Sequence, residues 1–218
     1  MEIVKKILNI FSKKLTTTKT DTPQYVDLGL PSGLKWAKCN IGAKTETDYG
    51  YYFQWGDIVN KRKSNCGWKR HKHCDGSFTT LTKYNTNSDY GTVDNKTTLD
   101  PEDDAATQIM GGDWRMPTYA EFQELLDNTT NEWIEDYKGS GINGRKFTSR
   151  ANGNSIFIPA AGYYSDGSVG NVGLGGNVWS SSLLLSSPYG ACYLKFSSDK
   201  CYMNYTNRYY GKSVRGVF

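Results

Sequence analysis

The last third of the chain, Ser155–Phe218, limits most strongly what this sequence can fold into. Three compact blocks punctuate it: an apolar run at 155–163, a Trp-Ser-Ser-Ser block at 179–182, and a closing block at 207–215. Between them the sequence is rich in Tyr, Ser, Gly and Asn, and eight of the chain's 16 tyrosines lie between 163 and 210. This composition is typical of a paratope, in which stiff amphipathic rings alternate with adaptable polar groups. A Tyr-rich face of a β-sheet is the alternative.

Glycines decide between these two interpretations at the sequence level. They interrupt the region between Gly167 and Gly176 at irregular intervals, whereas an exposed strand would alternate apolar and polar residues. Irregular glycines favour loops. We therefore expect the Tyr-rich region to consist mainly of irregular loops.

Bulk composition indicates one folded domain without a bilayer-spanning segment. The 218 residues suffice for one sizeable core. Mean hydropathy is −0.63, and no run approaches the roughly 20 apolar residues that a spanning helix needs. The net charge of +4 is confined to residues 1–20, which hold five Lys and one Glu, and the remainder is neutral. A neutral body argues against a nucleic-acid partner.

The first 22 residues are expected to be separate from the domain at 23–218. Apolar residues between Ile3 and Phe11 have helical spacing, and a Thr-rich linker, Thr16 to Thr22, follows. The apolar stretch is interrupted by Lys5, Lys6 and Asn9 and has no small-residue cleavage site, unlike a signal peptide. We expect a helix for docking or self-association, with a membrane-surface helix as the alternative. The compartment stays open between cytoplasm, virion and cell surface.

The order of predicted elements is strands, two helices, then strands, which is an α+β pattern. Strands are expected on both sides of a turn at 31–33, and at 51–57, 133–137, 144–148 and 155–158, with a tight turn at Asn143-Gly144. One helix is expected to start at Asp100-Pro101 and to end at Gly111. The second helix follows a capping box formed by Thr118 and Glu121.

Two stretches offer metal ligands, and neither is expected to hold a metal. Zinc would use the thiolates and imidazoles of the segment Cys66–Cys74, but its ligands are badly spaced and lie among basic residues. A solvated insertion loop explains the segment better, and a Cys66–Cys74 disulfide is a further alternative. The acids at 102–104 could bind calcium, yet a helix start accounts for them. We expect no cofactor.

Several blocks together resemble a known family. Residues 52–57, 112–122 and 211–215 look like the signature blocks of C-type-lectin-fold domains of the formylglycine-generating-enzyme type. Residues 26–37, 158–163 and 179–182 resemble more closely a paralogous domain of gut Bacteroidales and their phages. Some of its members are variable proteins of diversity-generating retroelements. The match covers about Tyr25 to Phe218 and is specific as a set of blocks.

This resemblance implies a C-type lectin fold with two helices, short antiparallel strands and long irregular loops, and a ligand-binding surface that is diversified. Mutagenesis at adenines converts Asn codons into codons for Tyr, Ser, Asp, Gly, Cys, Leu and others, which are common between 164 and 210. The implied ligand-binding residues are Tyr163, Tyr164, Asp166, Ser168, Asn171, Leu174, Asn177, Leu183, Leu184, Tyr189, Cys192, Tyr193, Lys195, Lys200, Tyr202, Asn204, Tyr205 and Tyr209.

The resemblance also implies a fixed framework. Its members are Trp179, Ser180, Ser181, Leu194, Phe196, Asn207, Arg208, Gly211 and Arg215. Lys212 departs from the pattern, because an aromatic residue usually precedes Ser-Val-Arg. This departure affects the expected local packing and not the expected fold.

Two other functions remain as alternatives. A formylglycine-generating oxidase would bind copper through a cysteine pair, and Cys192 and Cys201 lie in roughly the right part of the chain. No nearby His or acid is evident to lower a thiol pKa, so we expect no catalysis. A fixed glycan-binding adhesin module is the second alternative. The expected partner is a protein or glycan on a cell surface.

Overall fold

The computed structural model describes residues 25–61 and 65–218 and has the expected α+β composition. The predicted N-terminal helix and Thr-rich linker lie outside the described residues. Within these residues, the helices are all too short or too polar to cross a membrane. The elements are β1 Tyr25–Asp27, β2 Lys35–Ala37, η2 Trp68–Arg70, η3 Ser88–Tyr90, η4 Pro101–Asp103, α2 Ala105–Met110, α3 Tyr119–Asn128, β3 Thr129–Ile134, η5 Tyr137–Gly139, β4 Gly144–Ser149, β5 Ser155–Pro159, β6 Tyr163–Ser165, β7 Ser168–Gly170, β8 Gly175–Leu183, β9 Gly190–Ser197 and β10 Cys201–Asn207.

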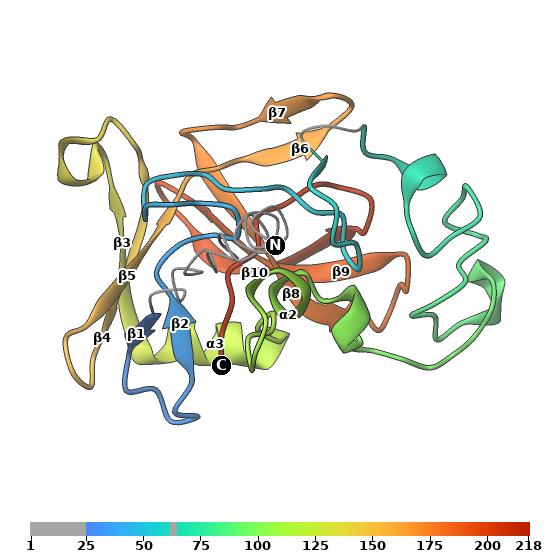
Figure 1. The fold of residues 1–218 in the computed structure, drawn as a ribbon, viewed down its shortest axis with the longest axis horizontal. Helices are drawn as coiled ribbons and strands as arrows, with labels where there is room; N and C mark the ends of the chain where they lie inside the picture. Colours follow the sequence, from blue (N-terminus) through green and yellow to red (C-terminus); the bar gives the residue numbers. More distant parts are fainter. Residues whose placement is uncertain (1–24, 62–64) are drawn as a thin grey trace, which may run out of the picture.

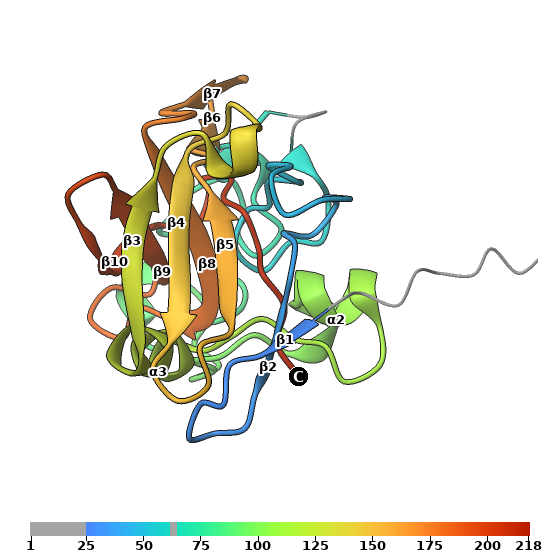
Figure 2. The same ribbon diagram turned by 90° about the vertical axis from the view of Figure 1, so that its left-hand side faces the viewer.

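Two three-stranded antiparallel sheets enclose the main core. One has the strand order β10-β9-β8 and the other β3-β4-β5, and helix α3 contacts both (Figures 1 and 2). Phe122 and Leu125 of α3 are fully buried against Leu194 and Phe196 of β9. The ends of the domain meet as well, since Lys35 N donates to Phe218 O at 2.9 Å.

The expectation of irregular loops between 163 and 210 was wrong, because strands β6 to β10 occupy most of this region. Its glycines have other roles. Gly167 and Gly173 adopt positive φ angles of 81° and 76°, as tight turns require. Gly176 lies inside β8 under the ring of Phe196, where a Cβ would come within 2.0 Å of Cζ. Irregular glycine spacing therefore reflects turns and close packing.

Local sequence signals predicted the start of α3 correctly and the start of α2 four residues too early. Thr118 and Glu121 form the capping box of α3. Residues 101–103 form a single 3-10 turn, and α2 begins only at Ala105. Asp104, rather than Asp100, caps α2. Its Oδ1 accepts hydrogen bonds from the backbone N–H groups of Ala106 and Thr107, at 2.8 and 3.0 Å.

Several predicted strands are confirmed, but the strand predicted at 133–137 lies at 129–134 instead, as β3. β1 and β2 pair on both sides of the turn at 31–33, and β4 and β5 lie close to the predicted bounds. Residues 51–57 form no regular strand, although Phe53 makes an isolated bridge with Lys212. The prediction of a tight turn at Asn143-Gly144 was wrong as well. Gly144 already pairs with Ile134, and the connection between β3 and β4 contains η5.

Candidate functional site

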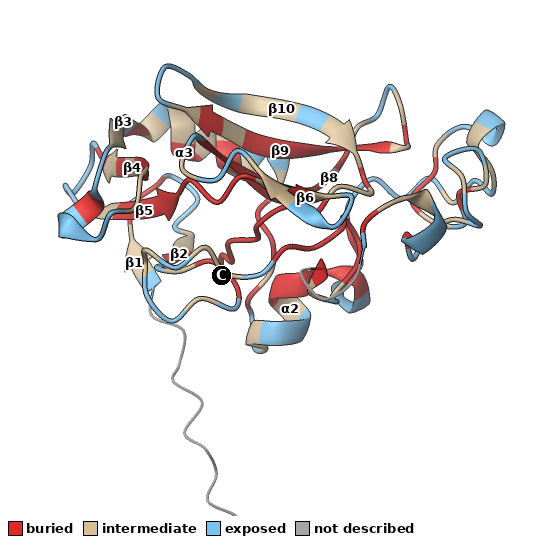
Figure 3. Ribbon diagram, turned by 90° about the horizontal axis from the view of Figure 1, so that it is seen from above, coloured by how far each residue is buried: buried red, intermediate tan, exposed pale blue. Residues whose placement is uncertain are grey.

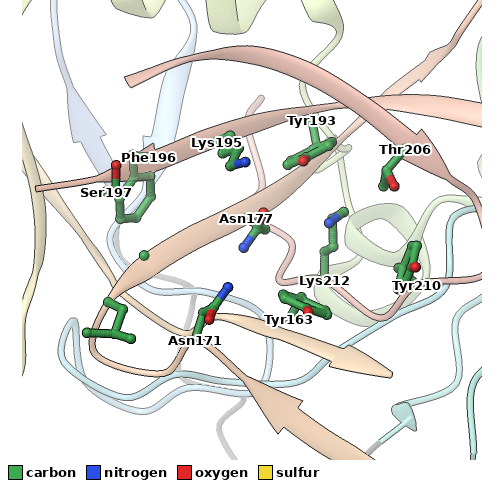
Figure 4. Close-up of a pocket in the computed structure, with 12 residues that line it drawn as sticks. Tyr163, Asn171, Asn177, Tyr193, Lys195, Phe196, Ser197, Thr206, Tyr210 and Lys212 are labelled. Carbon is green, nitrogen blue, oxygen red and sulfur yellow. The ribbon is translucent and has the colours of Figure 1, made fainter. Parts of the chain in front are cut away.

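A pocket of about 410 Å³ opens beside the β8-β9-β10 sheet (Figure 4). The β6–β7 hairpin, the turn before β8 and the chain after β10 form its other walls. The pocket is lined by Tyr163, Asn171, Leu174, Gly175, Asn177, Tyr193, Lys195, Phe196, Ser197, Thr206, Tyr210 and Lys212.

Strand alternation explains which side chains reach the pocket. Successive residues of a strand point to opposite sides of the sheet. Leu194 and Phe196 of β9 point into the core with α3, so Tyr193 and Lys195 point the other way. Across the sheet, Asn177 and Tyr202 pair with Lys195, while Trp179 and Asn204 pair with Tyr193. Two rows of polar and aromatic side chains thus cross the sheet at the pocket.

Lys212 lies at the centre of an aromatic cage formed by four rings. Its Nζ is 3.9 Å from the ring centroid of Tyr193, 5.0 Å from that of Trp179, 5.6 Å from that of Tyr163 and 5.7 Å from that of Tyr210. Such distances are typical of cation–π attraction. The residue is only 3% exposed.

The backbone fixes Lys212 in this place. Its N–H donates to Phe53 O at 3.0 Å, and its carbonyl accepts from Phe53 N at 2.9 Å. The neighbouring Gly211 exchanges two hydrogen bonds with Tyr164 of β6, at 2.7 and 2.8 Å. The C-terminal segment is therefore held on both sides, and the cage is a rigid part of the fold.

The ammonium group of Lys212 lacks a counter-ion. Within residues 25–61 and 65–218, no group accepts a hydrogen bond from its Nζ or forms an ion pair with it. Burial, followed by the positive charge of Lys195, lowers the pKa of Lys212 to about 7. Burial also raises the pKa of Tyr193 to about 12, so this phenol is neutral at ordinary pH.

The structure brings some of the predicted ligand-binding residues together at this site. Six line the pocket: Tyr163, Asn171, Leu174, Asn177, Tyr193 and Lys195. Tyr202 and Asn204 extend the same sheet face along β10. Asp166 and Ser168 are exposed at the tip of the β6–β7 hairpin.

Three predicted ligand contacts are instead interior residues. Tyr164, Leu183 and Cys192 are at most 8% exposed. Tyr164 packs on the ring of Tyr52 at 6.3 Å, on the opposite side of β6 from Tyr163. These residues are corrected to internal packing positions. Strand alternation turns Tyr164 and Cys192 away from the pocket, and Leu183 packs in the apolar cluster that also contains Trp179 and Tyr193.

Five further predicted contacts lie away from the pocket. Tyr189 packs against Phe78 at 5.6 Å, and Tyr209 packs against Trp68 at 5.4 Å. Leu184 and Lys200 lie in the connections between strands, and Tyr205 points to the opposite sheet face from Tyr202. The predicted residues therefore form several surfaces rather than one.

Sequence reasoning missed half of the pocket lining: Gly175, Phe196, Ser197, Thr206, Tyr210 and Lys212. Phe196 was predicted as framework, and its ring is buried in the core beside α3. The one signal for Lys212 was its departure from the aromatic residue that the family resemblance implied. In the structure, an amine takes that position and aromatic rings surround it.

The histidines of the segment Cys66–Cys74 are not solvated, and its two cysteines form no disulfide. His71 and His73 are buried, and their Nε2 atoms lie 3.1 and 3.0 Å from the carbonyls of Trp55 and Gly56. A carbonyl only accepts hydrogen bonds, so both Nε2 atoms carry protons. Burial lowers the pKa of both imidazoles. All five cysteines are free, and the Cys74 thiol donates to Trp68 O.

The acid cluster already contains a cation from the protein itself. Asp100, Glu102 and Asp103 place their carboxylates within 4.8 Å of one another. The Nζ of Lys83 lies among them, at 2.6, 2.9 and 2.6 Å. An ammonium thus occupies the position that a calcium ion would take.

Cys192 and Cys201 are not neighbours in the sheet. Cys201 pairs with Phe196, which is four residues from Cys192 along β9, or about 13 Å of strand. Burial raises the pKa of both thiols, to about 11 for Cys201. The two side chains therefore form no thiolate pair.

Comparison of the chain with protein-family models, with curated proteins and with solved structures gives no significant match.

Proposed function

We propose that this chain is a ligand-recognition protein with the C-type lectin fold, and that the pocket and the surrounding sheet face form its binding surface. The proposed surface comprises the β6–β7 hairpin and the pocket-facing residues of β8, β9 and β10. The proposal extends to diversification of this surface by a retroelement.

The observation that carries the proposal is the separation of framework from surface within one sheet. Trp179, Arg208 and Arg215, which the family resemblance implies are fixed, are completely buried. Arg215 donates to Asn40 Oδ1 at 3.0 Å, to Ala37 O at 2.8 Å and to Phe157 O at 3.0 Å, so it ties distant segments together. Substitutions at the pocket face would leave these contacts intact.

The chemistry of the exposed face also suits recognition. Tyr163, Asn171 and Thr206 combine rigid ring surface with hydrogen-bonding groups of low rotational freedom. The pocket volume of about 410 Å³ lies in the range of small-ligand sites. Figure 3 shows that β9 is buried along most of its length, whereas β10 is partly exposed beside it.

A module with one fixed glycan ligand is the alternative. It is favoured by the pocket itself, since a concave site with aromatic and amide groups suits a sugar ring. This alternative predicts one ligand and an invariant surface. The retroelement proposal predicts different ligands for different versions of the protein.

Deep sequencing of codons 155–218 in one natural population tests the proposal. We expect substitutions to concentrate at pocket-face codons such as those of Asn171, Lys195 and Tyr202, while Trp179 and Arg215 stay fixed. A uniform segment would reject diversification and leave the fixed-ligand module. Variation spread equally over buried and exposed codons would reject the proposed division into framework and surface.

A further inference from the structure

The Lys212 ammonium differs from the other buried cations of the described chain because it makes no hydrogen bond. Arg145, Arg208 and Arg215 also lack a carboxylate partner, but each donates to backbone carbonyls. Lys61, which is 6% exposed, has its own counter-ion in Asp57 at 2.6 Å. Lys212 is 3% exposed and has no such partner in the described residues. Burial of an unpaired charge is costly, and proteins normally provide an opposite charge. An anion that enters the pocket would supply the partner that the Lys212 ammonium lacks.

A second positive group faces the same space. Lys195 of β9 lines the pocket and lies close enough to lower the pKa of Lys212. None of the described residues that line the pocket is an aspartate or a glutamate. The two ammonium groups thus create a positive potential that no carboxylate of the lining offsets.

The remaining groups of the lining select among anions. The amide of Asn171 and the hydroxyl of Thr206 lie around the pocket, together with tyrosine rings (Figure 4). Asn177 and Ser197 also line it, but their donors are used within the protein, by Gly162 O and by the Asp199 carboxylate. A simple anion or an acidic peptide side chain needs only the ammonium groups. A sugar ring also uses the amides and hydroxyls for its own hydroxyl groups, and its apolar face can pack on an aromatic ring.

We propose that the pocket binds a sugar residue that carries a carboxylate, with the carboxylate paired to Lys212 and Lys195. This inference rests on the proposed function, because it names the class of ligand for the same surface. The sugar hydroxyls pair with the polar side chains at the rim.

A pH dependence follows from the groups around Lys212. The pKa of Lys212 is about 7, that of Tyr193 on β9 is about 12, and hydrogen bonding to Tyr209 raises that of Tyr210 to about 12. The other ionisable groups that face Lys212 are Lys195 on β9 and Tyr163 on β6. Asp166, at the exposed hairpin tip, acts on Tyr210. Since Lys212 loses its proton near neutrality, affinity should fall about tenfold from pH 6 to pH 8.

Titration of the full chain with glucuronate and with glucose, followed by NMR chemical shifts at pH 6, tests the inference. We expect glucuronate to bind at least tenfold more tightly than glucose, with shifts centred on β9 and the β6–β7 hairpin. In a Lys212→Met variant, which keeps an unbranched side chain in the cage, this preference should disappear. Lys200→Met is the matched control, because Lys200 is exposed in the β9–β10 turn, and it should bind like the wild type.

Equal affinity for glucuronate and glucose, or unchanged preference in Lys212→Met, would overturn the inference. A third titration uses a short peptide with one glutamate. Tighter binding of this peptide than of glucuronate would assign the carboxylate to a protein ligand and would also overturn it. Failure here is separate from failure of the proposed function, because population sequencing measures diversification without any ligand.

Discussion

Two lysines lie beside aromatic rings, the partly buried Lys83 and the buried Lys212, and their charges have opposite surroundings. The Nζ of Lys83 lies 4.8 Å from the centroid of Tyr84 and is surrounded by the carboxylates of Asp100, Glu102 and Asp103. Hydrogen bonds to these groups raise its pKa despite the opposing effect of burial. Lys212 lies at a similar distance from several rings but has no carboxylate, and its pKa falls to about 7.

This difference indicates that the charge of Lys83 stabilises the fold, whereas the charge of Lys212 is available to bind a ligand. In the Lys83 cluster, carboxylates of the protein neutralise the ammonium charge. The cluster also joins the segment at 83–84 to the start of α2. In the cage, no carboxylate neutralises the charge of the Lys212 ammonium, and an open pocket lies next to it. Aromatic rings attract a cation but do not neutralise it, so the cage holds an ammonium in place for an external anion.

The largest expected effect on stability comes from removing a carboxylate from the Lys83 cluster. Asp103 is 1% exposed, pairs with Lys72 and Lys83, and accepts from the Tyr84 hydroxyl at 2.6 Å. Asp103→Asn removes one buried partner and should lower the free energy of unfolding by about 3 kcal/mol at pH 7. Urea denaturation measures this loss.

The same cluster supplies a pH test and a control. Hydrogen bonds from Lys72, Lys83 and Tyr84 lower the pKa of Asp103, although burial itself acts to raise it. The stability that it contributes is therefore present above about pH 4 and is lost as pH falls below that value. Glu102→Gln, at an exposed member of the cluster, should leave stability unchanged. An equal loss in both variants would show that Asp103 has no special role.

The next effect comes from removing the unpaired charge. The pKa of Lys212 is about 7 in the folded chain and near 10.5 when unfolded, so the unfolded chain binds more protons between these values. Wild-type stability therefore gains from Lys212 as pH rises from 7. The stability of Lys212→Met relative to wild type should fall by roughly 2 kcal/mol between pH 7 and pH 9. A pH-independent difference would contradict an unpaired charge at this position.

The smallest stability effects belong to two exposed tyrosines of β10. Tyr202 is 39% exposed on the pocket face, and Tyr205 is 62% exposed on the other face. Alanine at either position should change the free energy of unfolding by no more than about 0.5 kcal/mol. Only Tyr202→Ala should weaken glucuronate binding, as measured by NMR titration. Equal binding losses in both variants would place the ligand outside the pocket.

Sequence signals were reliable where structure depends on neighbours along the chain. The capping box at Thr118 and the turn at 31–33 involve residues within three positions, and both are present. The role of Gly176 was unpredictable because it depends on Phe196, twenty positions further on and across the sheet. The spacing of glycines alone cannot distinguish a loop from a strand packed under a ring.

The candidate site shows the same limit. The family resemblance included six of the pocket residues among its implied contacts, but without the strand register it could not assign those contacts to the two faces of the sheet. The cage around Lys212 combines rings from β6, β8, β9 and the segment after β10. No local pattern encodes this arrangement, so the central residue of the site emerged only from the structure.

The most direct test of the account is an NMR titration of the lysine side-chain ammonium groups. We predict that Lys212 titrates near pH 7, that glucuronate shifts this midpoint upward, and that Lys83 keeps its proton throughout the range to pH 10. A Lys212 that titrates with an ordinary pKa near 10.4 and does not respond to glucuronate would contradict the account.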